Sequence, residues 1–207
     1  MKKHNPFETG AAEYDSWFQE NAAIFQSELS AIRACFLSDK KTLEIGIGTG
    51  AFALPLGIKE GLEPSEDMAA ICEAKGIHVE RGEAEELPYE SGSYEQIAMI
   101  TVDCFLNDID QALEEIRRVL TPDGNFIMAF LDRETPLGQI YEAGKEDDPI
   151  YRYATLRSSE EILTLLQKHH FTITGICQTV TELVNKEQPV LKGYGKGVFV
   201  AVQAKKQ

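Results

Sequence analysis

Short apolar runs alternate with amphipathic segments along the first two thirds of the chain. Five runs have the length and composition of buried strands: 41–45, 57–63, 77–81, 93–101 and 125–131. Between them apolar residues recur at helical spacing, most clearly over 110–120, where Ala112, Leu113, Ile116 and Val119 share one face. This alternation predicts a doubly wound α/β sheet with mostly parallel strands and helices on both faces.

The pattern changes at both ends of this region. Residues 8–36 read as an N-terminal helical extension, whereas 132–157 is polar and irregular, with prolines and glycines. A helix capped by Ser158 then leads to β segments at 171–180 and 197–202, which lack a helical crossover and must therefore pair antiparallel. We expect one domain in four parts: a helical extension or lid (1–38), a ligand-binding core (39–131), a substrate-side insertion (132–157) and a terminal helix with a hairpin (158–207).

Aromatic side chains are concentrated in the helical extension. Tyr14, Trp17 and Phe18 fall on one stripe, which is compatible either with core packing or with a lid over a ligand. Cys104 and Phe105 follow the fourth predicted strand, whose end should face the ligand crevice of a parallel sheet. We therefore expect these five residues on the substrate side of a site.

Composition narrows the choice of partners. The chain has 207 residues and a net charge of −14 without a basic cluster, which disfavours nucleic acid and leaves either solubility or a cationic or neutral small substrate as the role of the charge. No apolar run has membrane-spanning length and no signal peptide is evident, so we expect no membrane association and a cytoplasmic location. The four cysteines form no C-x-x-C pair, and we expect no metal.

A glycine-rich turn follows the first predicted strand. Gly46, Gly48 and Gly50 alternate after Glu44, a spacing that differs from the G-x-G-x-x-G of dinucleotide sites. Glycines let backbone N–H groups approach a ligand closely, while a carboxylate at Glu44 repels phosphate and attracts an ammonium group. Glu63, at the tip of the second strand, can accept hydrogen bonds from ribose hydroxyls. A nucleoside that carries a cation fits this site, and S-adenosylmethionine is such a molecule.

Four motifs in order extend this interpretation. They are 43–50 (LEIGIGTG), 62–68 (LEPSEDM), 82–88 (GEAEELP) and 113–124 (LEEIRRVLTPDG). Together they resemble the class I S-adenosylmethionine-dependent methyltransferases, in particular the small-molecule group that includes quinone-biosynthesis C-methyltransferases. The resemblance implies a Rossmann-like sheet of seven strands, mostly parallel, with a C-terminal antiparallel hairpin.

The resemblance also implies roles for individual residues. Glu44 would hold the methionine ammonium group, Glu63 the ribose, and Glu83, where the family usually has Asp, the adenine amino group. The full set of implied cofactor contacts is Glu44, Gly46, Ile47, Gly48, Gly50, Glu63, Pro64, Met68, Glu83, Ala84, Glu85 and Thr101. No general base is evident; Asp103 and Asp132 are the nearest candidates, although each is equally a loop carboxylate.

Our leading hypothesis is an enzyme that moves a methyl group from S-adenosylmethionine to a small molecule by in-line displacement, leaving S-adenosylhomocysteine. The acceptor atom is open among nitrogen, oxygen, carbon and sulfur. The alternative is a catalytically silent cofactor-binding sensor or partner subunit. A nicotinamide-dependent oxidoreductase is a more distant alternative, disfavoured by Glu44 and the glycine spacing.

Overall fold

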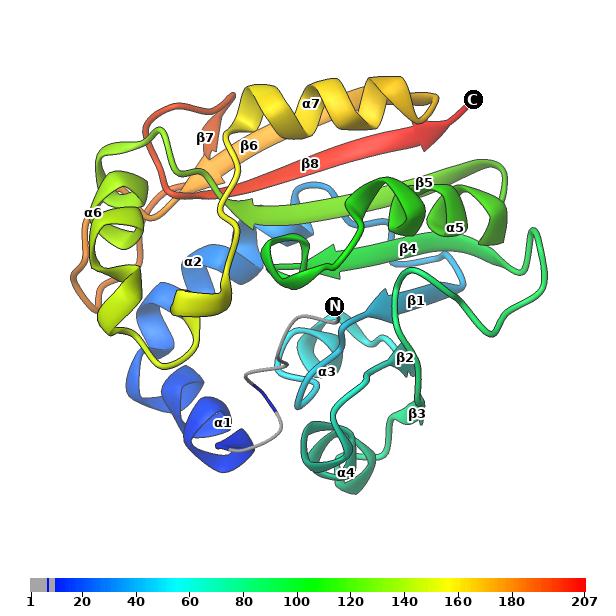
Figure 1. Cartoon of the computed structure of the whole chain (residues 1–207), viewed down its shortest axis with the longest axis horizontal. Coiled ribbons are helices and arrows are strands. Elements are labelled where there is room, and N and C mark those ends of the chain that lie inside the picture. The colour runs from blue at the N-terminus through cyan, green and yellow to red at the C-terminus, as the bar shows by residue number, and fades with distance from the viewer. Residues whose placement is uncertain (1–6, 8–9) are drawn as a thin grey trace.

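The computed structural model describes residues 7 and 10–207, which form one mixed sheet covered by helices (Figure 1). The strands run in the order β3-β2-β1-β4-β5-β8-β6-β7. Their bounds are β1 Thr42–Ile45, β2 Glu60–Leu62, β3 His78–Glu80, β4 Tyr94–Ile100, β5 Leu120–Leu131, β6 Phe171–Thr179, β7 Leu191–Lys192 and β8 Phe199–Lys206. The described strands number eight rather than the seven expected, because the short β7 adds to the edge of β6.

The doubly wound arrangement predicted from the alternating pattern is confirmed. Strands β1 to β5 pair in parallel, and the strand order reverses between β1 and β4. Along β4, Ile97 and Met99 pack toward one face of the sheet, whereas Ala98 and Ile100 pack toward the other. Burial on both faces explains why this strand reads as a continuous apolar run.

Helices cover both faces of the sheet. The elements are α1 Ala11–Glu20, α2 Ala22–Arg33, α3 Ala53–Leu56, α4 Glu66–Ala74, α5 Ile109–Val119, α6 Pro136–Gly144 and α7 Ser159–Lys168, with 3-10 turns η1 Asp103–Phe105, η2 Lys145–Asp147 and η3 Tyr151–Tyr153. Apolar residues of α2, α3 and α4 share one core cluster, and those of α5 and α7 share the other. Figure 1 shows α1 and α6 beyond the carboxyl ends of β4 and β5.

The last strands confirm the predicted antiparallel hairpin. β8 pairs antiparallel with both β5 and β6, so it lies between two strands that precede it in the chain. Its residues Val200 and Val202 are fully buried, as expected for a strand in the middle of a sheet.

The helical extension consists of two helices, separated at Asn21, whose φ of −113° and ψ of 37° interrupt the helical backbone; residues 8 and 9 lie outside the described residues. The predicted boundary between α5 and β5 was wrong. Helix α5 ends at Val119, and β5 begins at Leu120 rather than at 125. Pro122 lies within this strand, where the ladder to β4 is irregular and one donor can be missing.

The segment 132–157 is more regular than its composition suggested. Thr135 accepts a hydrogen bond from the Gly138 N–H and caps α6, with Pro136 in the first turn. Proline is favoured there because the first helical N–H groups have no intrahelical acceptor. Two 3-10 turns follow before α7, whose capping box joins Ser158 and Glu161.

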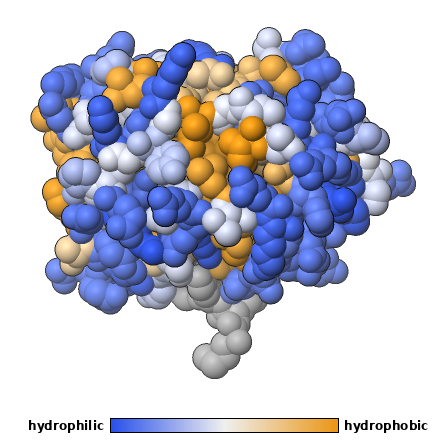
Figure 2. Space-filling view, turned by 90° about the horizontal axis from the view of Figure 1, so that it is seen from above, coloured by the Kyte–Doolittle hydropathy of each residue, from blue (hydrophilic) through white to orange (hydrophobic). Residues whose placement is uncertain are grey.

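The face shown in Figure 2 is mainly polar, with apolar side chains at its centre and further groups along its left edge and top. Within the described residues, every helix is either too short or too polar to cross a bilayer.

Candidate active site

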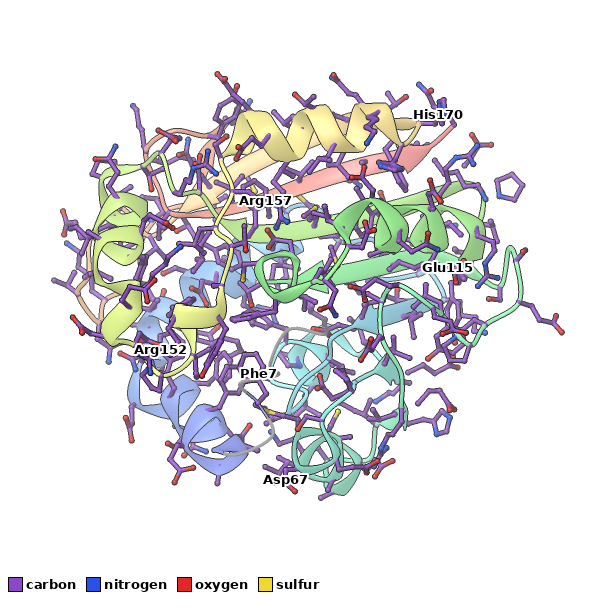
Figure 3. All side chains as sticks on the ribbon, viewed as in Figure 1. Phe7, Asp67, Glu115, Arg152, Arg157 and His170 are labelled. Atoms are coloured by element: carbon purple, nitrogen blue, oxygen red, sulfur yellow. The ribbon has the colours of Figure 1, made fainter. Side chains whose placement is uncertain are left out.

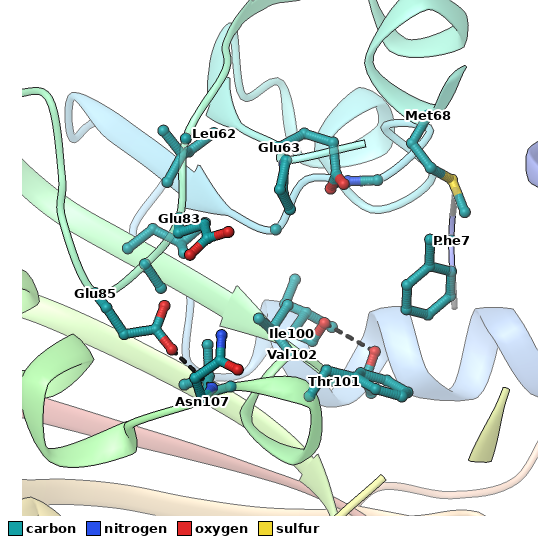
Figure 4. Close-up of a pocket in the computed structure, with 18 of the residues that line it drawn as sticks. Phe7, Leu62, Glu63, Met68, Glu83, Glu85, Ile100, Thr101, Val102 and Asn107 are labelled. Carbon is teal, nitrogen blue, oxygen red and sulfur yellow. Dashed lines mark hydrogen bonds between the residues drawn. The ribbon is translucent and has the colours of Figure 1, made fainter. Parts of the chain in front are cut away.

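A cavity of about 440 Å³ opens at the carboxyl ends of β1, β2 and β4, where the strand order reverses. Its volume lies within the range of small-molecule sites, about 300–1,000 Å³. It is lined by Phe7, Tyr14, Ile45, Gly46, Gly48, Leu62, Glu63, Pro64, Met68, Gly82, Glu83, Ala84, Glu85, Ile100, Thr101, Val102, Phe105, Leu106 and Asn107. In Figure 4, Met68 and Phe7 lie on one side of it and Glu83 and Glu85 on the other.

The glycine turn brings the backbone to the cavity wall. Gly46 has a φ of +66° and Gly48 a φ of +57°, a region that residues with a side chain rarely adopt. A Cβ on Gly46 would lie 2.4 Å from the Cγ2 atom of Val102, which also lines the cavity. The chain therefore needs glycine at this position both for its conformation and for its space.

Glu63 is held in place by the turn that it faces. One carboxylate oxygen accepts the Gly48 N–H at 2.9 Å, and the other accepts the Ser65 N–H at 2.9 Å. Burial raises the pKa of Glu63, although these two N–H donors and the Arg81 charge oppose the shift. A carboxylate oxygen has more than one lone pair, so each can still accept a hydroxyl donor from a ligand.

Glu44 carries a buried carboxyl group below the cavity wall. It is 2% exposed, and its Oε2 atom has no hydrogen-bond partner in the part of the chain that the structure describes. Burial, together with the nearby charge of Glu63, holds its pKa well above the ordinary value. Two neighbouring buried carboxyls favour a positively charged ligand group between or beside them.

Backbone strain occurs at Thr101, where β4 ends. Its φ is +55°, which is unusual for a β-branched residue, and its hydroxyl donates to the Ile100 carbonyl at 2.8 Å. Such outliers cost about 1–3 kcal/mol and are concentrated at functional sites. The strained residue lines the cavity and turns the chain toward η1.

Nine of the twelve predicted cofactor residues line the cavity: Gly46, Gly48, Glu63, Pro64, Met68, Glu83, Ala84, Glu85 and Thr101. Glu44, Ile47 and Gly50 do not. Glu44 is buried beneath the turn, the Ile47 side chain packs over Gly61, and Gly50 packs against Cys72. Glu85 has a structural task as well, because its carboxylate accepts the N–H groups of Asn107 at 2.8 Å and Asp108 at 3.1 Å.

The predicted substrate-side residues fall into two groups. Tyr14 and Phe105 line the cavity, and each packs edge-to-face against Phe7, at 5.6 and 5.1 Å between ring centroids. Trp17 is 39% exposed, and Phe18 packs against other aromatic rings, including Phe25 at 5.2 Å. Cys104, a buried thiol outside any disulfide, does not line the cavity.

The two weak candidates for a general base lie outside the cavity wall. Asp103 is 3% exposed and pairs with Arg157 at 3.5 Å; burial raises its pKa to about 6, although Arg157 opposes the shift. Asp132 accepts the Ser159 hydroxyl at 2.6 Å and the Glu134 N–H at 3.0 Å. Both carboxylates therefore fix the segment between β5 and α7.

Eight lining residues were not among the predicted site residues: Phe7, Ile45, Leu62, Gly82, Ile100, Val102, Leu106 and Asn107. Ile45, Leu62 and Ile100 are the last residues of the three strands that meet at the cavity. Their place at the carboxyl ends of parallel strands was therefore a sign in the sequence that they could line a site. Phe7 gave no such sign, because its position beside the cavity depends on a contact with Phe105, which is distant in sequence.

Comparisons with known proteins agree with this geometry. A family model described as a methyltransferase domain matches residues 43–128. A solved S-adenosylmethionine-dependent methyltransferase from Thermotoga maritima, described as a possible histamine N-methyltransferase, is 39% identical, covers 98% of this chain and 99% of its own, and superimposes with a TM-score of 0.93.

Two further relatives differ in how much of the chain they cover. An uncharacterised protein of Methanocaldococcus jannaschii is 36% identical over 98% of this chain and 99% of its own length. A malonyl-[acyl-carrier protein] O-methyltransferase of Geobacter sulfurreducens is 30% identical over 62% of this chain and 52% of its own.

Fold and cavity together define a Rossmann-like methyltransferase. The chain belongs to the S-adenosylmethionine-dependent methyltransferase family. The family implies S-adenosylmethionine as cofactor, and the residues present fit it: the unpartnered Glu44 carboxyl suits an ammonium group, and the Glu63 carboxylate suits ribose hydroxyls.

Proposed function

We propose that this protein binds S-adenosylmethionine in the cavity and transfers its methyl group to a small-molecule acceptor, releasing S-adenosylhomocysteine. The observation that carries the proposal is the pair of buried carboxyls, Glu44 and Glu63, around a glycine turn in which a Cβ atom on Gly46 or Gly50 would clash with its neighbours. This set of donors and acceptors suits an adenosyl group with a cationic tail and disfavours a pyrophosphate.

The cofactor would supply a methyl group on a sulfonium, which is already an excellent leaving group. The chain's task is then to hold the acceptor in line with that methyl and to keep water out. Orientation of this kind can supply about 7–11 kcal/mol of the barrier lowering. The aromatic rings of Phe7, Tyr14 and Phe105 close one side of the cavity and would exclude water there.

The acceptor is proposed to be a small molecule, and the relatives suggest where to begin. The Thermotoga protein is described as a possible histamine N-methyltransferase, and the high negative charge of this chain is compatible with a cationic acceptor. The narrower resemblance to quinone-biosynthesis C-methyltransferases rests on the motifs alone. A first panel should therefore contain amines (histamine, tyramine, tryptamine and putrescine), each beside the analogue in which hydroxyl replaces the amino group, together with phenols and thiols.

Calorimetry with S-adenosylhomocysteine tests cofactor binding directly. We expect the intact protein to bind it, and Glu63→Gln to weaken binding by about 10- to 100-fold, the loss expected for one or more hydrogen bonds to a charged group. Glu66→Gln is the matched control, because Glu66 is 76% exposed at its side chain and pairs with Arg81. Absence of binding by the unmodified protein would overturn the proposal.

A labelled-methyl assay on the panel tests turnover. Binding of the cofactor without transfer to any amine, phenol or thiol would favour the catalytically silent sensor or partner subunit instead.

A further inference from the structure

Three tyrosine hydroxyls and one carboxyl, from four different elements, influence one another electrostatically on the side of the cavity that Tyr14 lines. They are the carboxyl of Glu28 on α2 and the hydroxyls of Tyr14 on α1, Tyr141 on α6 and Tyr151 in η3. Considering residues 7 and 10–207, none of these groups has a hydrogen-bond or ion-pair partner.

Contacts of the chain bring Tyr141 and Tyr151 to the side of the sheet on which Phe105 packs. The Thr155 N–H donates to the Cys104 carbonyl at 2.8 Å, which ties the segment after η3 to η1. The rings of Tyr141 and Tyr151 are 5.8 Å apart, and both pack against the same core cluster as Phe105. Figure 3 shows side chains filling the space between α1, α2 and the segment that carries Arg152, with Phe7 on the cavity side.

Tyr14 links this group to the cofactor cavity. It lines the cavity, and its hydroxyl lies within the electrostatic influence of Glu28 as well as of Glu63 and Glu44. Glu28 also acts on the hydroxyls of Tyr141 and Tyr151. Glu28 therefore influences three tyrosines from three different elements, and one of these tyrosines lines the cavity.

All four side chains are half-buried, so each remains accessible to a ligand. A carboxylate surrounded by aromatic rings is suited to a cation, which gains both charge-assisted hydrogen bonds and attraction to the ring faces. A neutral acceptor would offer Glu28 hydrogen bonds without the attraction between opposite charges, and an anionic acceptor would be repelled by the carboxylate.

We propose that Glu28, with Tyr14, Tyr141 and Tyr151, binds the methyl acceptor as a protonated small-molecule amine. This rests on the proposed methyltransferase function and specifies its substrate class. For transfer, the acceptor nitrogen loses one proton to the Glu28 carboxylate. The electron pair freed on nitrogen forms the bond to the methyl carbon as the carbon–sulfur bond breaks, with its pair remaining on sulfur.

The charge state of Glu28 gives the proposal a signature besides activity. Burial raises its pKa to about 8. The titratable groups that interact with its tyrosine neighbours are Cys104, Asp148 and the carboxyls of Glu44 and Glu63. At pH 7 the free protein therefore holds most of Glu28 protonated. A bound ammonium group stabilises the carboxylate, so amine binding should release close to one proton.

The test is calorimetry of the whole chain saturated with S-adenosylhomocysteine, using the four amines and their hydroxyl analogues in two buffers of different ionisation enthalpy. At least one amine should bind about tenfold or more tightly than its analogue and release a proton. Glu28→Gln should weaken that amine by about tenfold or more and abolish the proton release, while affinity for S-adenosylhomocysteine stays within about twofold.

The matched control is Glu20→Gln, an exposed carboxylate at the end of α1, which should leave both binding events unchanged. Tyr141→Phe and Tyr151→Phe remove only a hydroxyl, and each should weaken the amine by severalfold. If the cofactor product binds but no amine of the panel does, or if Glu28→Gln binds amines as the unmodified protein does, this inference fails and the proposed function stands. If the cofactor product does not bind, the proposed function itself fails.

Discussion

Gly46 combines two steric requirements at one residue. Its φ of +66° opposes any side chain, and so does the distance of only 2.4 Å that would separate a Cβ atom from the Cγ2 atom of Val102. We expect Gly46→Ala to destabilise the fold by about 1–3 kcal/mol, the typical cost of a strained backbone position, and to narrow the cavity. Chemical denaturation measures the first effect and calorimetry with S-adenosylhomocysteine the second.

Gly144 provides the comparison for this substitution. It has a φ of −96° at the end of α6, and a Cβ there would meet nothing within 4 Å. Gly144→Ala should leave stability and cofactor binding nearly unchanged. Equal effects of the two substitutions would show that the glycine turn has no special steric role.

Individual residues also show how far sequence reasoning can reach. Glu63 was predictable, because a carboxylate at the tip of a strand after a glycine turn can only face the crevice of a parallel sheet. Glu28 gave no signal, since its significance arises from tyrosines on α1, α6 and η3 that approach it only in the folded chain. For Glu85 the sequence suggested only a contact with adenine. It gave no sign that the carboxylate accepts hydrogen bonds from the N–H groups of Asn107 and Asp108.

Helix α1 is fastened to α4 by one ion pair. The Lys75 Nζ atom lies 2.6 Å from Asp15 Oδ1, and both side chains are about three-quarters shielded from solvent. Since Tyr14 lines the cavity, this pair holds part of the cavity wall. A partly exposed pair contributes about 0.2–1 kcal/mol, so Asp15→Asn should raise local opening of α1 by up to about fivefold. Hydrogen exchange of the α1 amides measures the opening.

Glu13→Gln is the control on the same helix, since Glu13 is an exposed carboxylate in the first turn. It should leave exchange at α1 unchanged. Faster exchange throughout the protein in Asp15→Asn, rather than at α1, would contradict the expected local effect.

Among the elements, α6 shows why composition can mislead. The glycines and prolines of 132–157 suggested an irregular loop, yet Thr135 and Pro136 are a helix-starting pair, with a capping oxygen followed by a residue that needs no N–H acceptor. The central strands were predictable because burial on both faces makes them apolar throughout. The length of β5 was not predictable from the sequence, because proline and glycine, as at Pro122 and Gly124, normally end a strand.

Across the whole molecule, two sets of carboxyl groups change the stability of the fold with pH, and they do so in opposite directions. Burial raises the pKa values of Glu28, Glu44, Glu63 and Asp103. Each raised group contributes stability that is complete below its unfolded pKa, 4.5 for Glu and 3.8 for Asp, and is lost as pH rises through the folded value. Hydrogen bonds and ion pairs lower the pKa values of others, such as Asp110 and Glu115, whose contribution is lost as pH falls through their folded values.

We therefore expect the free energy of unfolding to be greatest at about pH 5. It should decline between about pH 5 and 8, because Glu28 ionises in this interval. Denaturant titrations across this interval measure the decline. Glu28→Gln should make this decline smaller, because the amide cannot ionise. Saturating S-adenosylhomocysteine should also make the loss of stability at pH 8 smaller if its ammonium group neutralises the buried carboxyls. Constant stability from pH 5 to 8 would contradict the assigned burial of these groups.

The position of β8 between β5 and β6 has a consequence for biosynthesis. While the ribosome is still making residues 132–198, β5 presents an open edge that its later neighbour will occupy. Unpaired apolar edges promote association between nascent chains, so this interval is the one in which chaperone protection would matter most.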